Sequence, residues 1–283
     1  MSEVHKSVFD HEIFDRDTFD LIPILKRLKG KAIKQLGSSG GGNHFVEFGE
    51  VEITEEDQQI GLPKGKYLGI LSHSGSRGFG AEIAQYYSRV ATEQCPLPKE
   101  AQNFAWLDLD SHLGLEYWTA MNLAGDYAKA CHDDIHRRLV KAVGCRVKAR
   151  IENHHNFAWK EIHGGKEVIV HRKGATPASE NELGIIPGSM TAKGFIVRGK
   201  GNPESLNSAS HGAGRQHSRG ACRNLFTQND IKKELKLKNV TLIGGSNEEA
   251  PMAYKNINEV MNAQSNLVDI LGTFQPRIVR MDK

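Results

Sequence analysis

The sequence has few cysteines and no long hydrophobic run. Its four cysteines are far apart and form no CxxC pair: Cys95, Cys131, Cys145 and Cys222. A disulfide framework is therefore not expected, and a reducing cytoplasm is the expected location. No stretch reaches the roughly 20 apolar residues that a membrane helix needs, so no membrane partner is expected. The polar, acidic first residues also lack the pattern of a signal peptide.

The sequence also lacks a strong net charge and a P-loop. Lys and Arg together number 37 and Asp and Glu 34, which gives a formal net charge of +3. That balance does not by itself indicate nucleic-acid binding, so a polyanion would have to be met by a local basic patch. Because no GxxxxGK[ST] motif occurs, a nucleotide would need a different cradle.

Hydrophobic periodicity predicts a mixture of helices and strands. The 283 residues, 39% of them hydrophobic, can bury a substantial core. Helical spacing is found near 19–28, over 81–90, over 115–143 with Gly144 as its stop, and near 256–271. Short apolar runs predict strands at 67–73, 167–172, 194–199, 240–244 and 277–281. Since there is no regular βαβ alternation, we expect an α+β fold with a mixed or antiparallel sheet core and flanking helices.

The 13 histidines and 29 glycines are unusual because several occur together. Histidines lie in four loop-like segments, GGGNHFVE (40–47), SHSGSRG (72–78), ENHHNFA (152–158) and SASHGAGR (208–215). A lone histidine is more often structural than functional. Four in loops rich in Gly, Asn and Ser favour a site, because such loops are poor core material and their backbone amides can bind anions.

Two chemistries fit these loops. In one, His44, His73 and His155 converge on a divalent metal, for which neutral imidazole is a good ligand. In the other, His211 is a nucleophile, and Arg215 holds a phosphate while the imidazole attacks phosphorus. The tight turn PGSM (187–190) could grip a base or a phosphate with its backbone amides.

Seven motifs together resemble the RtcB family of RNA ligases. GGGNHFVE, HSGSRGFG, NHHNFA, HRKGATPA, PGSM, SASHGAGR and EAPMAYKNINEVM occur in the family's order and span residues 35–264. The resemblance implies a single ligase domain over 1–283. It also implies the joining of an RNA 3′-phosphate or 2′,3′-cyclic phosphate to a 5′-hydroxyl, with GTP and Mn²⁺ and through a GMP–histidine intermediate, in tRNA splicing or RNA repair.

The same resemblance assigns roles to individual residues. His211 would be the nucleophile, and His44, His73 and His155 would bind metal. Tyr254 would stack on guanine. The nucleotide pocket would also include Asn43, His44, Phe45, Val46, Glu47, His155, Asn156, Pro187, Gly188, Ser189, Met190, Gly212, Ala213, Gly214 and, as the family's C-terminal lysine, Lys283.

The sequence departs from the family pattern upstream. No DxxCG-type motif, which supplies an Asp and a Cys to the family's metal centre, precedes the NHF segment. We therefore expect either an activating protein or a second chain that supplies these ligands. At the other end, simple alignment puts Met281 at the family's lysine position. RNA would be held by basic residues in or beside the motif loops: Arg77, Arg172, Lys173, Arg198, Arg215, Arg219 and Arg223.

Two other functions stay open on the sequence. The histidines could bind one metal and open a 2′,3′-cyclic phosphate as a metal-dependent phosphoesterase. The chain could also be a non-catalytic RNA-binding remnant. A GMP adduct that depends on GTP would indicate the ligase, hydrolysis without GTP the phosphoesterase, and salt-sensitive RNA binding without an adduct the remnant.

Overall fold

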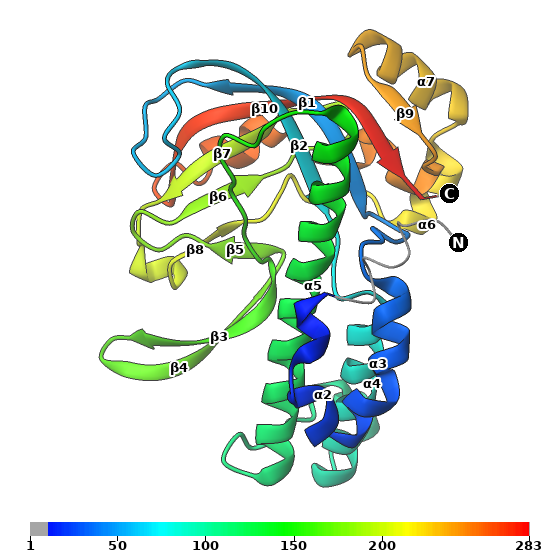
Figure 1. Cartoon of the computed structure of the whole chain (residues 1–283), viewed down its shortest axis with the longest axis vertical. Coiled ribbons are helices and arrows are strands. Elements are labelled where there is room, and N and C mark those ends of the chain that lie inside the picture. Colours follow the sequence, from blue (N-terminus) through cyan, green and yellow to red (C-terminus); the bar gives the residue numbers. More distant parts are fainter. Residues whose placement is uncertain (1–10, 283) are drawn as a thin grey trace. The chain divides into compact units, whose positions relative to one another are not determined.

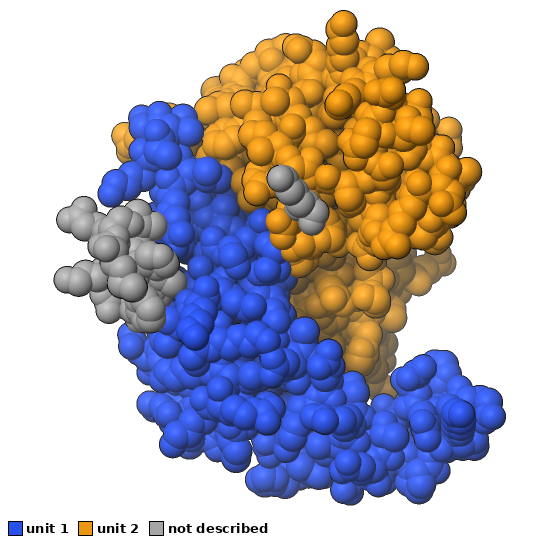
Figure 2. Space-filling model, turned by 90° about the vertical axis from the view of Figure 1, so that its right-hand side faces the viewer, with its two compact units in different colours: residues 1–40, 72–144 blue, residues 41–71, 145–283 orange. Residues whose placement is uncertain are grey.

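The computed structural model describes residues 11–282, which form two compact units (Figure 2). Unit 1 comprises the described part of Met1–Gly40 together with Ser72–Gly144. Unit 2 comprises Gly41–Leu71 and the described part of Cys145–Lys283. The helices and the mainly antiparallel sheet confirm the predicted α+β class. The single ligase domain over 1–283 stays a prediction. No helix within residues 11–282 is long and apolar enough to cross a membrane.

Unit 1 is helical. Its elements are η1 (Glu12–Asp15), α2 (Thr18–Leu21), α3 (Pro23–Gln35), α4 (Arg77–Gln94), η2 (Lys99–Phe104) and α5 (His112–Val143). Pro23 is in the first turn of α3, where its missing N–H costs nothing. Gly144 ends α5 in the left-handed conformation, at φ 70°, as the sequence predicts. The helix predicted at 81–90 is longer at both ends in the structure. It begins at Arg77, within the segment that looked like a turn, and continues to Gln94.

Aromatic side chains form the core of unit 1. Phe19, Phe79, Tyr87 and Tyr127 are all almost completely buried. The rings of Phe79 and Tyr127 meet edge to face with their centroids 5.0 Å apart, and the Tyr127 hydroxyl donates to the Ala32 carbonyl at 2.7 Å. This core fixes the middle of α5 against α3 and α4, because Tyr127 belongs to α5 and its contacts to the other two helices.

The main sheet has six strands, and β10 pairs with three of them (Figure 1). The order is β2 (Gly65–His73), β1 (Phe45–Ile53), β10 (Val268–Met281), β7 (Gly194–Gly199) and β6 (Leu183–Ile186). The β1–β10, β10–β7 and β6–β7 pairs are antiparallel, while β9 (Thr241–Ile243) pairs with β10 in parallel. The strands predicted at 67–73, 194–199, 240–244 and 277–281 are thus all present in this sheet.

Two short ladders complete the strands of unit 2. The hairpin of β3 (Asn156–His163) and β4 (Lys166–Lys173) contains the strand predicted at 167–172. The second ladder pairs β5 (Ala175–Pro177) with β8 (Ser208–Ser210). The remaining elements are η3 (Pro203–Ser205), α6 (Arg219–Leu225), α7 (Gln228–Leu237), η4 (Asn247–Glu249), η5 (Pro251–Ala253) and α8 (Ile257–Asn262).

The helix predicted near 256–271 is wrong in its second half. The helix α8 ends at Asn262, and from Val268 the chain is the strand β10. The Gln264 side chain lies at the junction, where its oxygen accepts a hydrogen bond from the Ser210 amide at 2.8 Å. The apolar residues that mimic a helical stripe, Val268 and Leu271, are instead buried in the sheet. Pairing of residues 268–270 with β7 outweighs the local spacing.

Gly49 marks a place where two strands of the sheet approach too closely for a side chain. Gly49 pairs with Pro276 of β10, and the register of the β1–β10 pair shifts between Phe48 and Gly49. A Cβ at this position would lie 2.4 Å from the Gln275 carbonyl oxygen and 2.6 Å from the Phe274 ring. Because the nearest atom belongs to the backbone of the central strand, the strand itself would have to shift.

We expect Gly49→Ala to lower the free energy of unfolding by about 1–3 kcal/mol, since it overpacks the sheet. The matched control is Gly30→Ala in α3, where a Cβ would meet nothing within 4 Å. That exposed helical glycine should gain about 0.5–1 kcal/mol as alanine. Urea unfolding measures both, and equal stability of Gly49→Ala and the unchanged protein would contradict the close approach.

Candidate active site

Two of the predicted site histidines stack on each other in unit 2. The ring centroids of His155 and His211 are 4.9 Å apart, and the ring planes differ by 18°. His155 immediately precedes β3, and His211 immediately follows β8. Histidines from two different motif loops are therefore placed face to face.

Backbone hydrogen bonds around Gly174 hold this pair in place. The antiparallel pairing of Ala175 with Ser210 brings Gly174 beside His211. The His211 amide donates to the Gly174 carbonyl at 3.4 Å, and the Gly174 amide donates to the His155 carbonyl at 3.2 Å. Gly174 has φ of 72°, which glycine adopts without strain. One residue thus connects the backbones of both histidines.

The surroundings of His211 favour its neutral form. Burial lowers the pKa of His211, and the charge of Lys173 lowers it further, while the Gly174 carbonyl acts in the opposite direction. Within residues 11–282, the buried Nδ1 atom of His211 has no hydrogen-bond partner. A neutral imidazole with an unengaged ring nitrogen can bind a metal, accept a proton or attack an electrophile.

The loop after His211 lies against the PGSM turn. The Ala213 amide donates to the Pro187 carbonyl at 3.2 Å, and the Ser210 hydroxyl donates to the Gly212 carbonyl at 2.7 Å. A Cβ on Gly212 would lie 3.1 Å from the Pro187 carbonyl oxygen, so a small residue suits this position. The structure therefore brings together two segments, 187–190 and 211–214, that the sequence assigned to one nucleotide pocket.

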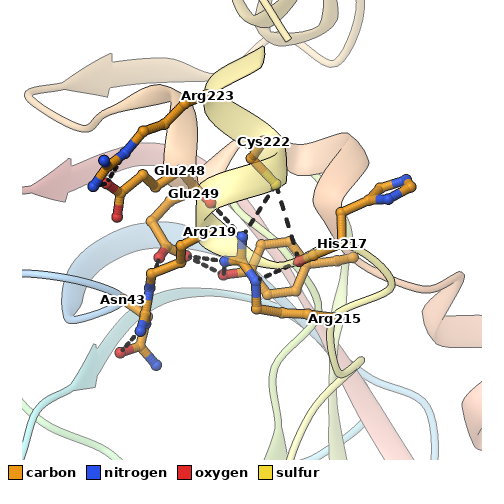
Figure 3. Close-up of polar contacts among 9 residues, drawn as sticks. Asn43, Arg215, His217, Arg219, Cys222, Arg223, Glu248 and Glu249 are labelled. Carbon is orange, nitrogen blue, oxygen red and sulfur yellow. Dashed lines mark hydrogen bonds and ion pairs between the residues drawn. The ribbon is translucent and has the colours of Figure 1, made fainter. Parts of the chain in front are cut away.

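The buried side chain of Glu249 accepts hydrogen bonds from three side chains near the loop that follows His211 (Figure 3). The Glu249 side chain accepts from Arg215 Nη1 at 2.9 Å, from Arg219 Nε at 2.9 Å and from the Tyr254 hydroxyl. Glu249 is only 2% exposed. Arg219 also donates to the Asn43 side-chain oxygen at 3.2 Å, which connects the loop before β1 to the same network. Asn43 and Tyr254, which the sequence assigned to the nucleotide pocket, thus share one set of contacts.

Arg215 does not have the arrangement expected of a phosphate clamp. Its guanidinium also donates to the His217 carbonyl at 3.0 Å, to Cys222 Sγ at 3.3 Å and to the Glu248 carbonyl. The guanidinium carbon lies 5.1 Å from the centroid of the Tyr254 ring. The hypothesis that Arg215 grips phosphate is therefore wrong for this structure, because its donors bind protein acceptors. Arg215 instead holds the loop after His211 to the segment 248–254.

Tyr254 has its hydroxyl and one side of its ring engaged. Burial raises the pKa of Tyr254, and the neighbouring Glu249 carboxylate raises it further. The phenol therefore stays protonated and donates to Glu249. Arg215 lies over the ring, so a stacked base would have to use the opposite face.

Two further arginines expected to meet RNA form ion pairs within the protein. Arg172 is 2% exposed and binds both oxygens of Glu161, at 2.5 and 2.9 Å, while it also lies over the Trp159 ring. Arg198 pairs with the buried carboxylate of Asp57. The hypothesis of an RNA contact is wrong for Arg172, because its carboxylate partner holds it in the interior. For Arg198, whose side chain is 32% exposed, the RNA contact stays a prediction.

Glu47 is a carboxyl buried in the main sheet. It lies in β1 opposite Val279 and is 3% exposed. Burial raises the pKa of Glu47 to about 8, so this side chain is largely protonated near neutral pH. A protonated carboxyl can donate a hydrogen bond, which an ionised one cannot.

The metal set proposed from sequence stays a prediction. His44 immediately precedes β1 and belongs with His155 to unit 2, whereas His73 ends β2 and belongs to unit 1. In the described part of the chain, no three His, Cys, Asp or Glu side chains form a group that could hold a metal ion. The buried, unengaged Nδ1 of His211 and the adjacent His155 ring are compatible with a cation at this place.

Three of the other residues predicted for the nucleotide pocket lie in strands. Phe45 and Val46 lie in β1, where Phe45 pairs with Met281 of β10. Asn156 begins β3 and pairs with Lys173. The expected contact from Lys283 lies outside the described residues. The sequence analysis did not predict a role for Glu249. The signal that could have indicated it is the arginine-rich segment 215–223, whose cations need a carboxylate partner.

Comparison with known proteins gives one consistent family. A family model described as tRNA-splicing ligase RtcB matches residues 15–282. The chain is 36% identical over 256 residues to RNA-splicing ligase RtcB of Escherichia coli (strain K12), a match that covers 86% of this chain and 60% of that protein. It is 32% identical over 270 residues to tRNA-splicing ligase RtcB of Methanococcus maripaludis, covering 82% and 56%. The chain thus spans about 60% of the length of such relatives.

Removing the buried carboxylate should destabilise the network. We expect Glu249→Gln to cost about 3–5 kcal/mol of unfolding free energy, because it leaves Arg215 and Arg219 without their shared counter-charge. The control is Glu248→Gln, whose side chain pairs with the exposed Arg223 and which should cost at most about 1 kcal/mol. Urea unfolding compares the two, and equal losses would show that Glu249 is not the centre of the network.

Glu47 predicts a pH dependence of stability. Its folded-state pKa of about 8 lies above the ordinary value of 4.5, so the folded state holds the proton more tightly. The stabilisation is complete below pH 4.5 and is lost as the pH rises through 8, by at most about 1.4 kcal/mol per pH unit.

Glu47→Gln should remove this decline, whereas Glu52→Gln at an exposed position of the same strand should keep it. Urea unfolding at several pH values between 5 and 9 measures the slope. An unchanged slope in Glu47→Gln would mean that the carboxyl is ionised in the folded protein.

Proposed function

This chain belongs to the RtcB family of tRNA-splicing ligases, and we propose that it joins RNA ends in a GTP- and Mn²⁺-dependent reaction. The substrates would be an RNA 3′-phosphate or 2′,3′-cyclic phosphate and a 5′-hydroxyl, in tRNA splicing or RNA repair. The observation that carries the proposal is the state of His211, whose pKa is lowered by burial and whose Nδ1 is unengaged.

His211 would act as the nucleophile. Its neutral imidazole attacks the α-phosphorus of GTP, a nitrogen–phosphorus bond forms and pyrophosphate leaves. The GMP then passes to the RNA 3′-phosphate, which restores the free imidazole. When the 5′-hydroxyl attacks that phosphate, GMP is the leaving group. The lowered pKa matters for the first step, because a protonated imidazole has no lone pair for the attack.

The surroundings of His211 would position it for this attack. The His155 ring lies against one face of His211, and the Gly174 carbonyl holds its backbone. Mn²⁺ bound by His44, His73 and His155 would neutralise the triphosphate's charge. The small residues 212–214 leave the backbone beside His211 accessible to phosphate oxygens.

The guanosine would be held by the loops that the structure brings together. These are the residues before and within β1, the PGSM turn, the 211–214 loop and Tyr254. Protonated Glu47 would donate to the base or sugar, and the face of the Tyr254 ring opposite Arg215 would stack on the guanine. Asn43, held by Arg219, and the Glu249 network would fix these loops.

The test is a covalent adduct. The chain is incubated with Mn²⁺ and GTP labelled at the α-phosphate, and we expect an acid-labile GMP adduct that disappears in His211→Ala. The matched control is His171→Ala, an exposed histidine of β4, which should keep the adduct. The assay is repeated with a second chain that carries a DxxCG-type motif, which should raise the yield if such a partner supplies metal ligands.

Absence of the adduct in both arrangements would overturn the proposal. Opening of a 2′,3′-cyclic phosphate without GTP would then indicate a phosphoesterase. Salt-sensitive RNA binding without either reaction would indicate a non-catalytic RNA-binding protein.

A further inference from the structure

Unit 1 contains a second histidine pair, outside the site around His211. His132 and His136 lie on α5, and both face the hydroxyl of Ser72. The Ser72 Oγ atom is 2.6 Å from His132 Nδ1 and 2.8 Å from His136 Nε2. Two imidazole nitrogens therefore converge on one point.

The spacing of this pair follows from the helix. Residues four apart lie on the same face of an α-helix, one turn from each other. The same spacing places the two histidines of zinc-binding helices around one ion. Cys131 and Ile135, the residues just before each histidine, are buried, so the core holds this part of α5 in place.

The three atoms that meet at Ser72, two imidazole nitrogens and a hydroxyl oxygen, can all bind a metal ion. A hydroxyl has a single hydrogen and can donate to only one of the two nitrogens, so the other must donate to the oxygen. Both nitrogens hydrogen-bond to the Ser72 oxygen, and an ion that displaces these two hydrogen bonds would be met by two imidazole nitrogens from one face of α5 and by the hydroxyl oxygen. Neutral imidazole is a preferred ligand of Zn²⁺ and related ions, with metal–nitrogen bonds of about 2.0–2.1 Å.

We propose that His132, His136 and Ser72 form a binding site for a divalent transition metal of the Zn²⁺ class. Across the described residues, no third His, Cys, Asp or Glu joins them. Water therefore completes the coordination, and the ion is exchangeable, unlike one in a closed structural site. The proposal does not rest on the function proposed above.

This site is separate from the metal set predicted around His73. Ser72 and His73 are successive residues of β2, and successive side chains of a strand point to opposite faces. The hydroxyl that meets α5 and the imidazole of His73 therefore point away from each other. A metal held by His132 and His136 does not need His44, His73 or His155.

The first test counts bound metal. Equilibrium dialysis against Zn²⁺ is carried out on the unchanged chain, on the double variant His132→Ala/His136→Ala, and on His112→Ala. His112 is an exposed histidine at the start of the same helix. We expect one equivalent fewer in the double variant and no loss in His112→Ala. Equal stoichiometry in all three proteins, with circular dichroism showing that each is folded, would overturn the proposal.

The second test adds a ligand instead of removing one. Ser72→Cys places a thiolate where the hydroxyl meets both imidazoles, and a thiolate binds Zn²⁺ or Co²⁺ more strongly. With Co²⁺ we expect a sulfur-to-cobalt charge-transfer band that the unchanged chain lacks, and tighter binding. The band should disappear when His132→Ala and His136→Ala are added. No band in Ser72→Cys would show that the three side chains do not converge on one ion.

Discussion

The buried carboxylate of Glu249 is the interaction on which the arrangement of unit 2 around the site depends. A carboxylate that is 2% exposed must be compensated, and here two arginines and a tyrosine compensate it. These donors come from the loop after His211, from α6 and from the end of η5. Through Arg219 the network also reaches Asn43, before β1. Loops that are distant in sequence are thereby held by one charge.

The second constraint is the short ladder of β5 and β8. It positions Gly174 between the backbones of His155 and His211, and the two rings stack as a result. Arg172 connects this ladder to β3, since it donates to Ser208 at 2.8 Å as well as to Glu161. A buried arginine that the sequence suggested as an RNA contact therefore stabilises the strands that carry His211.

Burial moves two site residues toward neutrality from opposite directions. It raises the pKa of Glu47 and lowers that of His211, because the charged form of each group is disfavoured away from water. Burial therefore leaves a neutral imidazole at His211, which keeps a lone pair, and a neutral carboxyl at Glu47, which can donate a hydrogen bond.

The sequence alone determined the fold class, most strands, the long helix ending at Gly144 and the family, because these depend on local periodicity and on ordered motifs. It also predicted a site at His211 and in the loops around it, and the structure places His155 and His211 side by side. Only the tertiary structure decided what the charged residues do. Arg172, Arg198 and Arg215 look alike in the sequence as exposed cations, yet each pairs with a carboxylate from another segment of the fold. The same holds for the segment from Val268 on, where pairing with β7 made a strand from helical spacing, since partners across a sheet cannot be read from neighbours in sequence.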